Sequence, residues 1–206
     1  IYIDFVDSVE VSGNTVTGDN NTGISIYYCN PATVTGNKVV GSSSVGIKIY
    51  NSYGNSTTER SLVANNMVNA GNSGIYTYSS NYTDIYYNTV ITFGTSTSTS
   101  YGALYFYNTS YVNVKNNIIT NSGANARLVS RGYGTYTDND FDYNLYYGGS
   151  SSYGFYSQST PYVNGNFSAW QTAGFDSNSV FQDPDFYASG DGFHLAAGNE
   201  LATPLT

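Results

Sequence analysis

The sequence predicts an all-β protein that winds as a right-handed, single-stranded parallel β-helix (a solenoid) of about six to seven coils, followed by a less regular C-terminal cover. Three observations predict this fold. An asparagine motif recurs throughout the chain, a short alternating strand follows the same period, and no helical pattern lies between the repeats. The composition agrees, because aromatic residues make up 17% of the chain and charged residues only 10%.

The first element of each repeat centres on an asparagine. A bulky apolar residue stands three positions before it, and another stands two positions after it. Successive asparagines are separated by 23, 29, 22, 29 and 27 residues. Asparagine tolerates the left-handed backbone conformation of a sharp bend, so each motif predicts a bend between two short strands. The six motifs span residues 11–16, 34–39, 63–68, 85–90, 114–119 and 141–146.

The second element is a strand that opens with glycine and then alternates in polarity. Alternation with a period of two indicates a strand with one buried face. Two stretches, 52–59 and 95–101, lengthen individual periods and predict protruding loops. The strands open at Gly23, Gly46, Gly74, Gly102 and Gly154, and residues 125–128 are expected to fill the gap with Asn125 in the glycine position.

A single repeat is too short to bury its own apolar side, so successive coils must stack on one another. Stacking at about 4.8 Å places like side chains above like, which creates an apolar column inside and an asparagine column at the bend. In such a column each amide can donate to the next, which satisfies buried polar groups. A β-propeller blade needs about 40–50 residues, which this period excludes.

The repeats are expected to occupy residues 1–158, and residues 159–206 are expected to form a capping segment of the same domain. In that segment Ser168 is the expected N-cap of one helical turn, and Trp170 is its apolar anchor. The chain opens as though in the middle of a strand, which suggests a fragment of a longer secreted protein.

The charge balance excludes several classes of partner. A net charge of −8 argues against nucleic acid and against anionic membrane surfaces, since both bind basic proteins. No apolar run is long enough to insert into a membrane. Cys29 is the only cysteine and His194 the only histidine, which excludes a disulfide framework and a multi-histidine zinc centre. His194 is expected to be structural.

On these signatures, residues 4–160 resemble the parallel β-helix repeats of secreted bacterial polysaccharide lyases, hydrolases and surface proteins. Residues 140–195 are similar to the ends of large secreted β-helix proteins of Bacteroidetes type. The motifs behind this second likeness lie at 142–147, 167–170, 183–186 and 193–195. The resemblance implies a secreted or cell-surface protein, and it implies no particular reaction.

The outward positions of the glycine-led strands predict a surface that contacts a glycan, with its aromatic residues in one exposed column. Sugar rings present apolar C–H faces to aromatic rings, and carboxylated or sulfated sugars pair with cations. Good strand formers that stack on themselves would give the same pattern without any ligand, so this alternative stays open. The candidate contact residues are Tyr27, Tyr50, Tyr76, Tyr78, Phe106, Lys48, Arg127 and Arg131.

Asp138, Asp140 and Asp142 alternate along one stretch, so their carboxylates are expected to share one face. Oxygen-rich clusters of this kind bind Ca²⁺, which makes them the one candidate metal site. EF-hand spacing is absent, and a solvated acidic edge also explains the pattern. No other cofactor is expected.

The leading functional hypothesis is a secreted cell-surface or extracellular-matrix protein without catalytic residues, which acts as a rigid rod, as a glycan-contacting surface, or as both. Unpaired strand edges at its ends also predict head-to-tail or lateral self-association. The alternative is a polysaccharide lyase, or another carbohydrate-active enzyme, that acts on acidic polysaccharides; Lys48, Arg127 and Arg131 have suitable chemistry for a lyase. Lys48 and Arg127 are expected about three coils apart, however, which is too far for one sugar.

Overall fold

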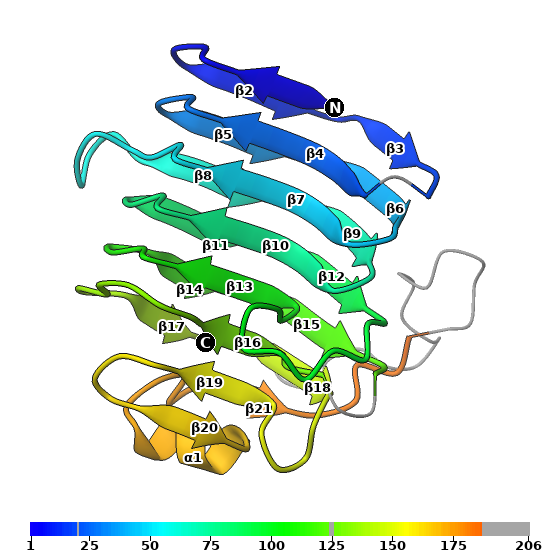
Figure 1. The fold of residues 1–206 in the computed structure, drawn as a ribbon, viewed down its shortest axis with the longest axis vertical. Helices are drawn as coiled ribbons and strands as arrows, with labels where there is room; N and C mark the ends of the chain where they lie inside the picture. Colours follow the sequence, from blue (N-terminus) through cyan, green and yellow to red (C-terminus); the bar gives the residue numbers. More distant parts are fainter. Residues whose placement is uncertain (20, 124–125, 187–206) are drawn as a thin grey trace.

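The computed structural model describes residues 1–19, 21–123 and 126–186. These residues form an all-β solenoid of about six turns with three sheets, so the predicted fold class is confirmed (Figure 1). The chain passes through the sheets in the same order in each turn and winds in the right-handed sense (Figure 1). We name the sheets A, B and C in the order in which the chain enters them.

Sheet A has eight strands, all paired in parallel except the last pair, β19 with β20, which is antiparallel. Its members are β1 (Tyr2–Asp4), β4 (Thr22–Tyr27), β7 (Val45–Tyr50), β10 (Ser73–Tyr78), β13 (Leu104–Tyr107), β16 (Val129–Arg131), β19 (Phe155–Ser157) and β20 (Val163–Gly165).

Sheets B and C have six and seven strands. Sheet B holds β2 (Val9–Ser12), β5 (Ala32–Thr35), β8 (Ser61–Ala64), β11 (Thr83–Tyr86), β14 (Asn113–Lys115) and β17 (Asp140–Asp142). Sheet C holds β3 (Thr15–Thr17), β6 (Lys38–Ser42), β9 (Met67–Ala70), β12 (Thr89–Thr92), β15 (Ile118–Asn121), β18 (Leu145–Gly148) and β21 (Val180–Phe181).

The interior consists of apolar columns that run along the axis of the solenoid. In sheet A one column stacks Ile24, Ile47, Ile75 and Leu104, each at most 1% exposed. Burial of a side chain of this size contributes about 1.5–3 kcal/mol. The glycine that opens several of these strands has a steric reason, because a Cβ at Gly46 would lie 2.1 Å from a Val68 methyl carbon.

The predicted asparagine ladder runs through the bends between sheets B and C. Each side-chain amide except the last donates to the Oδ1 of the asparagine one coil further on, at 3.0 Å, and all but the first donate also to a backbone carbonyl of the preceding coil. The residue before each asparagine has a positive φ, as the bend requires. The ladder consists of Asn14, Asn37, Asn66, Asn88, Asn117 and Asn144.

At its C-terminal end the ladder passes to the carboxylate of Asp176. Its Oδ1 accepts from Asn144 Nδ2 at 2.9 Å and from Ser179 Oγ at 2.5 Å. Its Oδ2 accepts from Tyr146 Oη at 2.9 Å and from Trp170 Nε1 at 2.6 Å. Burial raises the pKa of Asp176, and these four donors oppose that rise. In the described part of the chain Asn144 has no further asparagine to which it can donate, and the Asp176 carboxylate accepts its hydrogen bond in place of one.

The cap covers the last coil, with α1 (Phe167–Thr172) beneath β19 and β20 (Figure 1). Trp170 is fully buried and stacks on Phe175 with ring centres 4.0 Å apart, so its predicted role as anchor is confirmed. The predicted N-cap is wrong. Asn166, not Ser168, caps the helix, and its side chain accepts from the Ala169 amide.

Within the described ranges, no helix combines the length and the apolar character that crossing a membrane requires. The expectation that His194 is structural concerns a position outside the described residues.

We expect Asn88→Ala to lower the free energy of unfolding by about 1–3 kcal/mol, because it removes the acceptor of the buried Asn66 backbone N–H, one of the two acceptors of the Asn66 side-chain amide, and the donor to the Val63 carbonyl. Urea denaturation measures the change. Ser98→Ala, at an exposed position, is the control and should be close to silent. Equal stability of both variants would contradict a stabilising ladder.

Candidate functional site

Four tyrosines form a continuous column on the outer face of sheet A, and we call them the tyrosine column. They share one register position in β4, β7, β10 and β13, and all are partly exposed. Their ring centres are 4.9, 4.5 and 4.4 Å apart along the column. The four are Tyr27, Tyr50, Tyr78 and Tyr107.

The rings of this column face one another. The planes of Tyr50 and Tyr78 differ by 10°, and those of Tyr78 and Tyr107 differ by 2°. Neighbouring rings therefore cover both faces of Tyr50 and Tyr78, so that the column offers ring edges and phenolic hydroxyls to a ligand. The expected stacking of sugars on open ring faces does not fit this geometry at the centre of the column.

A second outward row runs beside the column and contains Lys48. Its register positions in β4, β7, β10 and β13 hold Ser25, Lys48, Tyr76 and Tyr105. Lys48 Nζ lies 5.2–5.3 Å from the ring centres of Tyr27, Tyr50 and Tyr76, a cation–π arrangement. These four strands contain no carboxylate, and no carboxylate of the described residues pairs with Lys48.

The structure corrects the placement of Phe106. Its ring is fully buried and packs edge-on against Phe141, while Tyr107 occupies the place expected for Phe106 in the exposed column. The cause is a slip of one residue, which reverses the two faces of a strand. The sequence pattern places Gly102 at the position that Gly74 holds in the preceding coil. The observed register places Ala103 there, because Leu104 pairs with Ile75, the residue that follows Gly74.

Arg131 is also placed wrongly by the sequence, because it lies in register with Phe106 and points inward. Its guanidinium is sandwiched between the rings of Tyr136 and Phe175, 4.4 and 4.7 Å from their centres. Its Nη1 donates to Ser157 Oγ at 3.2 Å, and its Nε has no hydrogen-bond partner among the residues that the structure describes. Burial lowers the pKa of Arg131 to about 10.

Arg127 lies ahead of β16 and is 5% exposed. Its Nη1 donates to the Tyr153 carbonyl at 2.8 Å and to Asn164 Oδ1 at 3.2 Å, and its guanidinium lies 4.9 Å from the ring centre of Tyr156. Burial lowers its pKa. Lys48, Arg127 and Arg131 thus have three different environments, and the structure does not assemble the cation and base that the lyase alternative needs.

The sequence reasoning missed Tyr105 and Tyr107. The signal was present, because Tyr105-Phe-Tyr107 repeats the pattern Tyr76-Thr-Tyr78 one coil later. Aligning tyrosine with tyrosine, in place of glycine with glycine, gives the observed register.

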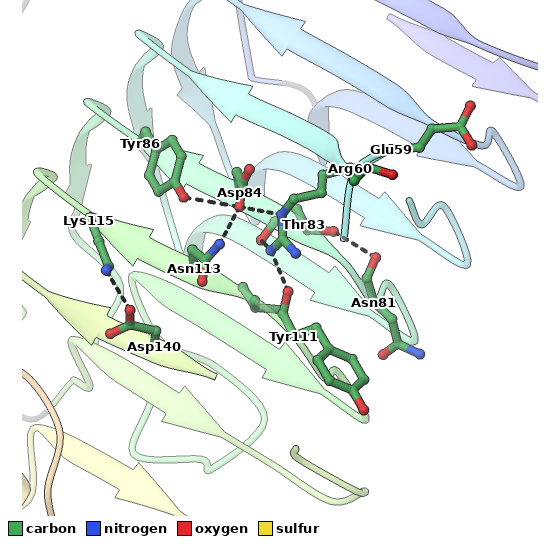
Figure 2. Close-up of polar contacts among 12 residues, drawn as sticks. Glu59, Arg60, Asn81, Thr83, Asp84, Tyr86, Tyr111, Asn113, Lys115 and Asp140 are labelled. Atoms are coloured by element: carbon green, nitrogen blue, oxygen red, sulfur yellow. Dashed lines mark hydrogen bonds and ion pairs between the residues drawn. The ribbon is translucent and has the colours of Figure 1, made fainter. Parts of the chain in front are cut away.

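A polar cluster covers part of the outer face of sheet B (Figure 2). Asp84 Oδ1 accepts from Arg60 Nε at 2.7 Å, Asn113 Nδ2 at 2.7 Å and Tyr86 Oη at 3.1 Å. Arg60 also donates to the Tyr111 carbonyl, which ties the loop before β8 to two later coils. Burial and the nearby Asp84 raise the pKa of Tyr86 to about 12, so this phenol stays protonated at neutral pH and serves as a donor.

The three carboxylates of the expected Ca²⁺ site have separate roles. Asp140 pairs with Lys115 at 2.5 Å (Figure 2), Asp142 accepts from the backbone and side chain of Asn178, and Asp138 occupies a bend with φ of 47°. Among the described residues, no group of acidic, histidine or cysteine side chains is arranged to hold a metal ion. Asp140 and Asp142 do lie on one face of β17, as predicted. Each carboxylate already binds a donor of the protein, Lys115 in one case and Asn178 in the other.

We expect Tyr105→Phe to weaken the alkaline destabilisation of the fold. Burial raises the pKa of Tyr105 to about 12 from an ordinary 10.0. The unfolded chain therefore loses this proton first, and the contribution of Tyr105 to stability, present below pH 10, is lost as the pH rises through about 12. Urea denaturation over this range should show a smaller decline for Tyr105→Phe than for wild type. Tyr133→Phe, at a ring that is 67% exposed, is the matched control, and a decline equal to wild type in Tyr105→Phe would contradict the assignment.

Comparison with known proteins gives one family match. Residues 1–91, which hold the strands from β1 to β11 and the start of β12, match the family model described as "Periplasmic copper-binding protein (NosD)". The matched segment is less than half of the 206 residues, and it contains most of the tyrosine column together with Lys48. No curated protein sequence and no solved structure gives a significant match.

Proposed function

We propose that this chain is an extracytoplasmic, non-catalytic β-helix domain that binds an acidic glycan along the outer face of sheet A. The observation that carries the proposal is a column of four tyrosines beside a lysine that forms an ion pair with no described carboxylate, on strands that contain no carboxylate. The extracytoplasmic location is supported by the match of residues 1–91 to a family described as periplasmic.

The chemistry of this face suits hydroxyl and carboxylate groups. Phenolic hydroxyls repeat once per coil along the column, and each can donate and accept a hydrogen bond. Lys48 adds three N–H donors and a positive charge in the middle of this row. An extended chain of sugars with carboxylates can therefore lie along the axis of the solenoid and meet one phenol per coil.

The distribution of charge favours an acidic ligand on this face despite the net charge of −8. Carboxylates concentrate on sheet B, where Asp84, Asp140 and Asp142 lie on the outer face, whereas β4, β7, β10 and β13 carry none. Asp4 of β1, in register with Tyr27, is the one carboxylate in the strands of sheet A. Exposed charges more than about 10 Å apart are largely screened at 0.1 M salt, so the local charge of the face governs binding.

Copper binding, which the matched family description names, is not part of the proposal. Copper favours thiolate, thioether and imidazole ligands, and this chain has one cysteine, one methionine and one histidine. Cys29 is buried, with its thiol 3.1 Å from the Tyr27 carbonyl oxygen, and Met67 lies exposed on β9 of sheet C. The residues present in the described part of the chain do not fit a copper site.

The proposal is tested by titrating oligogalacturonates, with uncharged cello-oligosaccharides for comparison. The double variant Tyr50→Phe/Tyr78→Phe keeps the stacked rings and removes two hydroxyls, and we expect it to weaken affinity by about 1 kcal/mol or more with an unchanged melting temperature. Lys48→Met keeps the aliphatic stem, and it should remove most of the salt dependence of binding.

The matched control is Tyr82→Phe/Tyr111→Phe, a stacked pair with ring centres 4.6 Å apart that lies just ahead of β11 and β14. This control should bind as wild type does. Absence of oligogalacturonate binding by the wild-type protein, or equal affinities for all variants, would refute the proposed function.

A further inference from the structure

A surface segment covers part of the outer face of sheet A, over strands β13, β16 and β19. The outward row that contains Lys48 and Tyr76 continues through Tyr105, Ser130 and Tyr156. Outward residues of a solenoid are ordinarily exposed, yet these three are 4%, 0% and 8% exposed. We call the covering segment, residues 95–101, the strap.

The strap is held on the sheet by a few polar contacts. Ser130 Oγ donates to the Thr99 carbonyl at 2.6 Å, and the side chains of Ser100 and Thr99 lie near the phenols of Tyr105 and Tyr156, where they oppose the rise in the pKa of each phenol. Most of the strap is exposed, and Tyr101 is its only large apolar side chain. Segments with few apolar contacts open at low free-energy cost, so the strap is the least stably held part of this face.

The register shows that the strap is an insertion between sheet C and sheet A. Ala70 pairs with Thr92, and Ile75 pairs with Leu104. Five positions separate Ala70 from Ile75, whereas twelve separate Thr92 from Leu104, an excess of seven residues. The strap has seven residues, and Gly94 still pairs with the preceding coil by donating to the Gly71 carbonyl at 2.7 Å.

We propose that the strap is a movable cover that sets the length of acidic glycan the face can bind, an inference that rests on the proposed function. With the strap closed, the open face ends at β13. With the strap displaced, the face continues over Tyr105, Ser130 and Tyr156, and it reaches a second cation, because the Arg127 guanidinium lies 4.9 Å from the Tyr156 ring centre. A long acidic glycan then meets Lys48 at one end of the face and Arg127 at the other.

Deletion of residues 95–101 is the direct test, because it removes the excess and leaves a connection of the length found one coil earlier. Oligogalacturonates of about three and about ten sugars are the probes. We expect roughly tenfold tighter binding of the long probe by the deletion variant and unchanged binding of the short one, since a closed strap lowers apparent affinity by the fraction of open molecules. Ser130→Ala, which releases Thr99 at full chain length, should change binding in the same direction by less.

Ser98→Ala removes a hydroxyl that accepts from the Ser100 amide within the strap, and it is the control that should bind both probes as wild type does. Equal ratios of long-probe to short-probe affinity in wild type, the deletion variant and Ser130→Ala would overturn the proposal. If the deletion variant fails to fold, a ratio in Ser130→Ala equal to that of wild type overturns it by itself.

A second readout separates failure of the strap from failure of glycan binding. Nitration of tyrosines, followed by mass spectrometry, should be slow at Tyr105 and Tyr156 in wild type and fast in the deletion variant, with Tyr107 reactive in both. Slow wild-type nitration without oligogalacturonate binding would refute the proposed function and the glycan role of the strap together. Binding with equal nitration rates in both proteins would refute the strap alone.

Discussion

Each amide of the asparagine ladder donates to the oxygen of the next rung, while the strands on both sides pair with the same neighbouring coil. These two sets of bonds require one register, because a slip of one residue would separate the amides and turn the apolar columns outward. The ladder also needs an acceptor beyond its last rung, which the cap supplies as the Asp176 carboxylate. Coil pairing, core and cap therefore depend on one alignment of the chain with itself.

The same alignment produces the outer surface. Stacking like residues above like in sheet A gives a column of tyrosines in which each ring covers its neighbour. Ring faces are thus used for stability, and edges and hydroxyls are left for recognition. The cation–π position of Lys48 among Tyr27, Tyr50 and Tyr76 holds a positive charge on strands without carboxylates, and no described carboxylate pairs with it.

Departures from the repeat are where the molecule gains individual features. An insertion of seven residues between sheets C and A covers outward tyrosines, and the two arginines near the cap are buried against aromatic rings. Arg131 is costly to bury because no carboxylate in the described part of the chain pairs with it, and the rings of Tyr136 and Phe175 offset part of that cost. These features make the last coils different from the first four.

The sequence by itself determined the repeat, the ladder, the three short strands per coil and the outward positions of Tyr27, Lys48, Tyr50, Tyr76 and Tyr78, because each follows from periodicity within one strand. Only the tertiary structure decided the face of Arg131, the burial of Arg127, the partners of Asp140 and Asp142, and the covering of Tyr105. Those outcomes depend on the path of a loop of seven extra residues and on which donors from distant coils arrive beside each group. A period of two can assign a residue to a face only once the starting point of the strand is known, and neighbouring coils supply that starting point.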